Sequence, residues 1–238
     1  MFCVKCGASL PDDANFCFKC GCDLRNLNQS VGTKYSCNTN VRVGSFYTFG
    51  RYPQEMCGGQ TPIEWQVLDI TNNDILLISR YGLDFCRYNE SCKHITWEQC
   101  TLRHWLNNTF YNEVFSEDER RRIKISHLVN QDNPQYHTVG GNDTDDRIFC
   151  LSLSEFFRFA ADPSFSMCYP TKYARNKGWV GDNGCCWWWL RSPSAGKPGC
   201  SSLLGVVISP NGVAAAGNGI SDASYLRPAL RIFRWGEF

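Results

Sequence analysis

The sequence lacks an excess of either charge, because 24 lysine and arginine residues face 23 aspartate and glutamate residues. A balanced chain has no general attraction for nucleic acid or for an anionic membrane surface. It also lacks any apolar run near the roughly 20 residues that a membrane-spanning helix needs, and nothing at Met1 resembles a secretion signal. We therefore expect a cytoplasmic protein that binds neither nucleic acid nor a membrane.

Histidine is scarce, and the common catalytic motifs are missing. The 4 histidines show neither HxxxH nor HxH metal-binding spacing. The sequence also has no GxSxG nucleophile motif and no glycine-rich loop suited to cradle phosphate. These absences disfavour catalysis.

Cysteine, in contrast, is abundant, with 15 residues. An odd count without a secretion signal favours reduced thiols and a metal site over a disulfide scaffold. Two CxxCG motifs near the start resemble the zinc-ribbon family across residues 1–25, with an iron–sulfur site as the alternative. The predicted zinc ligands are Cys3, Cys6, Cys17 and Cys20. Acidic residues balance the lysines of this segment, so we expect a structural or protein-contacting ribbon.

Beyond the ribbon, residues 26–42 are polar and have no regular period, which is typical of a linker. Residues 43–238 then form the main domain. Its patterns predict strands first, helices next and strands last, which indicates an α+β domain with antiparallel sheets. Expected strands cover 43–50, 64–70, 75–79, 148–151, 187–191, 203–209, 213–216 and 226–233; expected helices begin after Thr96, Ser116, Ser152 and Thr171, and the first ends at Asn107-Asn108.

Three consecutive tryptophans, Trp187 to Trp189, commit more side-chain area to one place than any other stretch. Successive side chains of a strand point to opposite faces, so both faces here must be covered. We expect a central buried strand, in which one of the three rings could instead form the floor of a ligand site. Arg191 and Arg227, each beside an apolar strand and a proline, are expected to include at least one buried guanidinium satisfied by carbonyls or an acid.

A set of spaced motifs resembles a bacterial family of uncharacterised domains, the DUF6273 type, over nearly all of residues 43–235. These motifs are Pro62-Ile-Glu-Trp65, Thr96-Trp97 with Leu102-Arg103 and Trp105-Leu106-Asn107, Phe110-Tyr111, Leu151-Ser152 with Glu155, Trp188-Trp-Leu-Arg-Ser-Pro193 and Leu226-Arg-Pro-Ala-Leu230. That family is similar to the C-type-lectin-like fold of formylglycine-generating enzymes and of variable proteins diversified by retroelements. The resemblance implies terminal strands that pair and a ligand face built from the C-terminal third.

The same resemblance raises an enzymatic alternative, because formylglycine-generating enzymes use two cysteines late in the chain. Cys185, Cys186 and Cys200 lie in that region. Adjacent residues of a strand point to opposite faces, so Cys185 and Cys186 cannot both reach one copper ion without a break in the strand. We therefore rank an oxidase below a binding protein, with a zinc-ribbon regulatory adaptor as a third possibility.

Binding is favoured by the composition of residues 192–225. Every residue there except Lys197 is of a type that mutation of the adenines in AAC-type codons can encode. A segment diversified by a retroelement has this property. An ordinary hairpin rich in Gly, Ser and Ala has the same composition. We expect a protein or peptide ligand, with Tyr225 as aromatic anchor and Asp222 as the acid. The predicted ligand-binding residues are Cys200, Ser201, Ser202, Asn218, Ile220, Ser221, Asp222, Ser224 and Tyr225.

Overall fold

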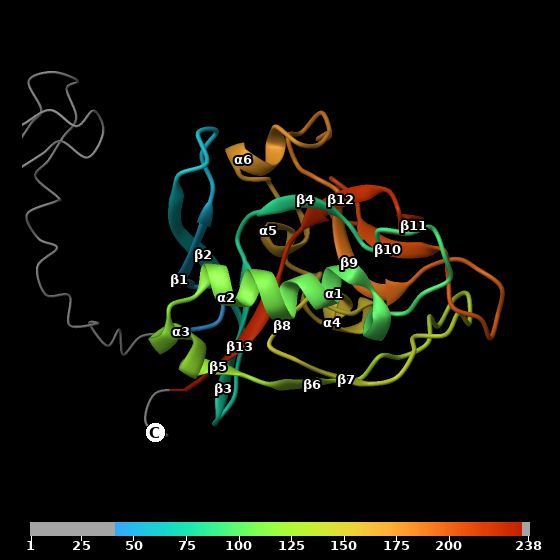
Figure 1. Cartoon of the computed structure of the whole chain (residues 1–238), viewed down its shortest axis with the longest axis horizontal. Helices are drawn as coiled ribbons and strands as arrows, with labels where there is room; N and C mark the ends of the chain where they lie inside the picture. The colour runs from blue at the N-terminus through green and yellow to red at the C-terminus, as the bar shows by residue number, and fades with distance from the viewer. Residues whose placement is uncertain (1–40, 235–238) are drawn as a thin grey trace, which may run out of the picture. The chain divides into compact units, whose positions relative to one another are not determined.

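Six strands form the first sheet of the structure, a computed structural model that describes residues 41–234 (Figure 1). Its spatial order is β1-β2-β3-β13-β5, β8 also pairs with β13, and the pairs are antiparallel. The domain is thus mixed α and β with mostly antiparallel sheets, as the sequence predicts. The strands are β1 (Phe46–Pro53), β2 (Gln60–Ile70), β3 (Asp74–Ser79), β5 (Ile123–Lys124), β8 (Ile148–Phe149) and β13 (Ala229–Phe233).

The hairpin predicted between residues 64–70 and 75–79 is confirmed by the pairing of β2 with β3. Its turn is closed by the Thr71 hydroxyl, which accepts hydrogen bonds from the backbone N–H groups of Asn73 and Asp74. Every residue of β3 is buried. This strand is therefore covered on both faces of the sheet. It also lies between two neighbouring strands, β2 and β13.

The terminal strands do not pair with each other. Within residues 41–234, β1 pairs with β2, whereas β13 lies between β3 and β5. The direct pairing of first and last strands that the family resemblance implies is therefore wrong. The apolar residues of β13 are better buried between two strands than at an edge, and Ala229, Leu230 and Ile232 are fully buried there.

Five strands form a second sheet in the order β11-β10-β9-β12-β4. β9 and β12 are parallel, and the other neighbours are antiparallel. The sheet curls, so that the Asn218 side chain on β11 reaches the backbone oxygen of Ala223 and the hydroxyl of Ser224 on β12. Its strands are β4 (Asp84–Arg87), β9 (Trp188–Pro193), β10 (Leu204–Ile208), β11 (Ala214–Gly219) and β12 (Ala223–Leu226).

The tryptophan strand is the central strand of this second sheet, as predicted. All six residues of β9 are buried. The indole N–H of Trp188 donates to the Ser166 oxygen at 3.3 Å, and that of Trp189 donates to the Cys86 oxygen at 2.9 Å. Both rings thus bury large apolar areas while their polar atoms keep partners. Trp187 lies just before the strand and is only half-buried.

The chain passes from the second sheet to the first at Arg227-Pro228, so the single strand predicted over 226–233 is wrong. Pro228 has no N–H for a ladder, and β12 ends one residue before Arg227. The Arg227 guanidinium is buried, donates to the backbone oxygens of Ser79 and Phe165, and lies over the Trp188 ring. The predicted burial of at least one of the two arginines is confirmed.

Short helices cover these sheets. The capping boxes predicted at Ser116 and Ser152 are confirmed, and Thr171 caps a short helix as expected. The box predicted at Thr96 is wrong, because the Cys100 sulfur accepts the N–H of Arg103 instead. The helical segments are the 3₁₀ turn η1 (Trp97–Gln99), α1 (Thr101–Trp105), the π-helical η2 (Leu106–Phe110), α2 (Tyr111–Val114), α3 (Glu117–Arg122), α4 (Leu153–Phe159), α5 (Pro163–Ser166) and α6 (Lys172–Arg175).

Asn107 does not end a helix, in contrast to the prediction. Its side-chain oxygen accepts the N–H groups of Arg147 at 2.7 Å and Ile148 at 3.2 Å, and its amide nitrogen donates to the Ile148 oxygen at 2.9 Å. The amide thus takes the place of a backbone partner for β8, and the helix continues past it through η2. A two-stranded sheet, β6 (Ser126–Leu128) with β7 (Thr144–Asp146), completes the described elements. None of the helices in residues 41–234 is long and apolar enough to cross a membrane.

Candidate ligand-binding site

The predicted ligand-binding residues separate into two places. Cys200, Ser201 and Ser202 belong to the loop between β9 and β10. The Ser202 hydroxyl is buried and donates to the Ala195 oxygen at 2.6 Å, which ties the loop to itself. The Ser201 oxygen lies 2.5 Å from the His94 ring nitrogen, and Cys200 is exposed. This loop packs against residues 94–95 and 137–139 and lines none of the hollows described below.

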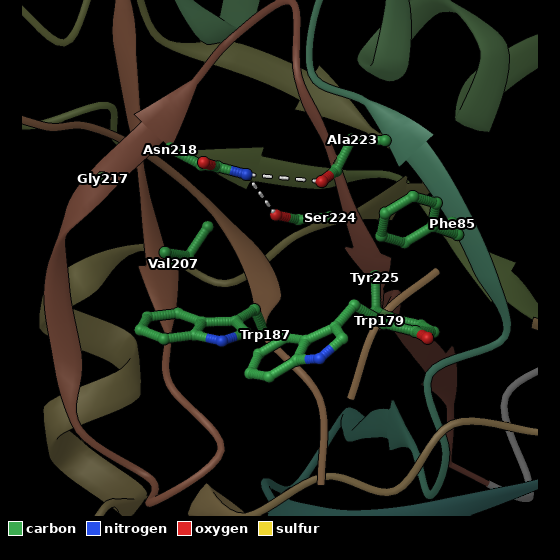
Figure 2. Close-up of a pocket in the computed structure, with 9 residues that line it drawn as sticks. All are labelled: Phe85, Trp179, Trp187, Val207, Gly217, Asn218, Ala223, Ser224 and Tyr225. Carbon is green, nitrogen blue, oxygen red and sulfur yellow. Dashed lines mark hydrogen bonds between the residues drawn. The ribbon is translucent and has the colours of Figure 1, made fainter. Parts of the chain in front are cut away.

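The second group lies at the mouth of the curled sheet. Asn218, Ser224 and Tyr225 line a hollow of about 330 Å³ (Figure 2). Ile220, Ser221 and Asp222 form the turn between β11 and β12; Ile220 is buried there, whereas Asp222 is exposed. The hollow is lined by Phe85, Trp179, Trp187, Val207, Gly217, Asn218, Ala223, Ser224 and Tyr225.

Strand alternation explains which residue of β4 lines the hollow. On β4, Phe85 faces this hollow, whereas its neighbours Asp84 and Cys86 line a different one on the other face. β10 contributes Val207, and β11 and β12 contribute the remaining strand residues. Every strand of the sheet except β9 thus provides a wall, and Trp187 takes this role immediately before β9. Mouths of barrel-like sheets are common ligand sites.

Trp179 and Trp187 are the largest of the lining residues that are absent from the predicted ligand-binding set. Trp179 lies in the loop after α6 and is 67% exposed, although large aromatic side chains are usually buried. Trp187 was one of three rings considered for the floor of a site. No local pattern places Trp179 at the hollow, because the neighbouring Gly178 packs against the ring of Phe85, which is distant in the sequence.

A second hollow, of about 600 Å³, shares both tryptophans with the first. We call the two hollows together the tryptophan groove. Because the indole rings of Trp179 and Trp187 line both parts, one extended ligand can contact them from either side. The second part is lined by Trp179, Gly181, Asp182, Asn183, Trp187, Ser209, Pro210, Asn211, Val213 and Ala215.

Tyr225 is buried at the inner wall of the groove. Its ring packs edge-on against Phe85 with centroids 4.9 Å apart. Burial, with Cys186 nearby, raises the pKa of the Tyr225 hydroxyl to about 12. That hydroxyl is buried and has no hydrogen-bond partner among residues 41–234. It therefore stays protonated at neutral pH and can donate a hydrogen bond only if another group reaches it.

The late cysteines do not form an activated pair. Cys185 and Cys186 are both buried, and burial raises the pKa of each thiol above its usual value. Cys200 is exposed in the separate loop after β9. In the described part of the chain, no cluster of three or more His, Cys, Asp or Glu side chains could hold a metal ion.

The predicted zinc ligands Cys3, Cys6, Cys17 and Cys20 lie outside the described residues, as do the ribbon at 1–25 and most of the linker at 26–42. Their spacing in the sequence still fits zinc. Each CxxC pair can present two thiolates to one ion, and two pairs complete a tetrahedron.

Comparison with protein families gives two matches. A domain of unknown function, DUF6273, matches residues 72–233, and a zinc-ribbon domain matches residues 2–24. Both agree with the resemblances expected from the sequence. β1 and β2 precede the segment that matches DUF6273. No curated protein and no solved structure matches the chain.

Proposed function

The chain belongs to the DUF6273 family, and we propose that its domain of this type is a binding module that holds a protein or peptide ligand in the tryptophan groove. The observation that carries the proposal is the exposure of Trp179 beside the half-buried Trp187 at an open hollow. An exposed indole is unfavourable in water and becomes favourable when a ligand covers it. Aromatic anchors of this kind dominate binding energy in interfaces.

A peptide fits the groove better than one compact molecule does. The two parts meet at the shared tryptophans, so an extended chain can place neighbouring side chains in each part. Volumes of about 330 and 600 Å³ are within the usual range for ligand pockets. Polar groups for orientation are available from Asn218 and Ser224 in the first part.

We further propose that this domain is a variant of the C-type-lectin-like fold and that its C-terminal face is diversified by a retroelement. Support for the fold comes from the curled, mostly antiparallel sheet and from a groove lined largely by the C-terminal third. Support for diversification comes from the residue set between Ser192 and Tyr225. Comparing the encoding DNA with a nearby imperfect repeat tests this, because diversification predicts mismatches at adenines alone.

Oxidation of a peptidyl cysteine, the enzymatic alternative, ranks behind binding. Such chemistry needs an accessible thiolate, and burial raises the pKa of both Cys185 and Cys186. The adaptor alternative concerns the zinc ribbon at residues 2–24, whose four cysteines would hold zinc and stabilise a segment too small to fold alone. Deleting the ribbon and repeating a binding assay separates a ribbon-dependent adaptor from binding by the groove.

Selection from a random peptide library tests the binding function. The full chain serves as bait without counter-selection, and each selected peptide is then measured against the variant Trp179→Ala/Trp187→Ala. Selected peptides should bind the double variant at least about tenfold more weakly than the unmodified chain, because aromatic anchors carry much of the affinity.

The matched control is Phe157→Ala, because Phe157 on α4 is 61% exposed and lines neither part of the groove. It should leave the dissociation constant unchanged. Peptides that bind the double tryptophan variant as tightly as the unmodified chain would contradict the proposal, as would a library that yields no binder.

A further inference from the structure

The tryptophan groove carries charge of one sign. Among all its lining residues, Asp182 is the one charged side chain, and it is exposed. A second acid, the exposed Asp222, lies in the turn directly before Ala223 of the lining. No lysine or arginine lines either part. The groove therefore favours a positively charged ligand group over a negatively charged one.

Its aromatic walls favour the same charge. Phe85, Trp179, Trp187 and Tyr225 line the first part of the groove (Figure 2). The face of an aromatic ring is electrically negative and attracts a cation placed over it, most strongly in tryptophan. Alkylammonium groups combine apolar surface with positive charge, so they match a hollow built from rings with an acid nearby.

Two cations of α6 and the loop after it, Arg175 and Lys177, lie near the groove but line neither part of it. Lys177 is held by Asp84 at 2.7 Å and by the Tyr173 hydroxyl at 2.8 Å. Its ammonium also lies 4.0 Å from the centre of the Tyr173 ring. Arg175 acts on Tyr225 electrostatically but lines neither part of the groove. The ammonium group of Lys177 therefore lies over the Tyr173 ring and beside the carboxylate of Asp84.

The side-chain amide of Asn218 in the groove is also suited to a ligand that donates a hydrogen bond. The side-chain nitrogen of Asn218 donates to the Ala223 oxygen at 3.3 Å and to the Ser224 hydroxyl at 3.0 Å (Figure 2). With both N–H groups directed to these acceptors, the carbonyl oxygen is the end of the amide that a ligand can use. A carbonyl oxygen accepts hydrogen bonds, which an ammonium group provides.

We propose that the tryptophan groove recognises an alkylammonium group, such as a lysine side chain or its methylated forms, between Trp179 and Trp187 with Asp182 as counter-ion. This inference rests on the proposed binding function and assigns its ligand class. It predicts a basic peptide as the natural partner.

Choline and its neutral carbon isostere, 3,3-dimethyl-1-butanol, test the inference directly. The two molecules share shape and size and differ in charge. Titration of the full chain is followed by the indole N–H signals in NMR spectra, with Trp179 and Trp187 assigned through their replacement by phenylalanine. Choline should shift these two signals and bind at least about fivefold more tightly than the isostere.

Charge variants define the contribution of the counter-ion. Asp182→Asn should weaken choline about two- to fivefold and leave the isostere unchanged, because an exposed acid acts through a screened field. Asp118→Asn on α3 removes another exposed acid, outside the groove, and should change the affinity for neither molecule.

Equal affinity for choline and the isostere would overturn the ammonium assignment. The groove would then bind a neutral apolar group, and the proposed binding function would stand. Absence of choline binding, or choline shifts confined to other tryptophans, would also overturn the ammonium assignment. The binding function itself fails only if the peptide selection yields no ligand that depends on the groove.

Discussion

Arg191 and Glu155 form a two-pronged ion pair that joins β9 to the first turn of α4. The guanidinium nitrogens lie 2.5 and 3.3 Å from the two carboxylate oxygens. The same carboxylate accepts the backbone N–H of Ser152 at 2.8 Å and so closes the capping box of α4. The guanidinium also donates to the Cys150 oxygen and to the Asn130 side chain. One buried arginine thus fixes the central strand against the helix that covers it.

Arg191→Ala should lower the free energy of unfolding by about 3 to 5 kcal/mol, because it leaves a carboxylate and several buried acceptors without their donor. Denaturant titration at pH 7 measures the loss. The control is Arg121→Ala on α3, whose ion pair with Glu117 is 65% and 72% exposed and should matter by less than about 1 kcal/mol. Equal effects of the two substitutions would contradict a structural role for Arg191.

Asp74 predicts how stability depends on pH. Burial alone raises the pKa of this carboxyl, but the hydrogen bond from Lys124 and the charge of Arg231 outweigh it and hold the pKa below 3.8. The two nitrogens lie 2.6 and 2.7 Å from the carboxylate. A folded-state pKa below the unfolded value contributes stability above pH 3.8 that is lost as the pH falls through the folded value.

Asp74→Asn should therefore lower the free energy of unfolding, and the difference from the unmodified chain should be largest at neutral pH. The difference should shrink below about pH 4, where the unfolded carboxyl is protonated in any case. Denaturant titrations between pH 3 and 7 give both curves. A constant difference over this range would show that Asp74 contributes through packing and not through its charge.

Substitutions at Gly50 and Gly44 allow the cost of backbone strain to be measured separately from the cost of steric crowding. Both have positive φ, +68° and +83°. A Cβ on Gly50 would lie 2.6 Å from the Phe115 ring, whereas one on Gly44 would have no described atom within 4 Å. Gly44→Ala should cost about 1 to 2 kcal/mol of strain, and Gly50→Ala about 1 to 3 kcal/mol more. Thermal unfolding of the two variants measures the difference. Equal melting temperatures would contradict the predicted clash at Gly50.

Metal removal tests the ribbon. The family match at residues 2–24 predicts one zinc per chain, lost on substituting any of Cys3, Cys6, Cys17 or Cys20 by serine. Cys22→Ser should retain it. Chelation should leave the melting transition of the main domain unchanged, because that domain has its own core. Metal analysis that finds iron, or no metal, would contradict zinc ligation.

Local signals explain most of what the sequence predicted correctly. The strands expected at 203–209 and 213–216 pair as β10 and β11 around Asn211-Gly212, where Gly212 adopts φ of +76°, which few other residues tolerate. Ser152 with Glu155 specifies a helix start because both groups of the capping box lie within four residues. Each of these features depends on neighbours in the chain, so one sequence contains the whole signal.

The errors involve partners far apart in the sequence. Pro228 is a local signal for the break between β12 and β13, but the passage of the chain into the first sheet involves a distant partner, because Arg227 donates to the oxygen of Ser79, 148 residues away. The continued helix at Asn107 depends on the backbone of β8, about 40 residues later. Trp179 joins the groove only where the curled sheet brings Phe85 and Tyr225 together. No local pattern encodes such distances.

The position of β13 also determines when this domain can fold during synthesis. β3, β5 and β8 all pair with β13, yet each is made well before it. Until residue 233 has left the ribosome, these strands lack the partner that buries them, so the first sheet cannot close on a partial chain. Contacts of such long sequence separation slow folding. The nascent domain therefore keeps apolar strand surface exposed until β13 has been made, and removal of residues 229–233 should yield aggregated protein and not a smaller folded core.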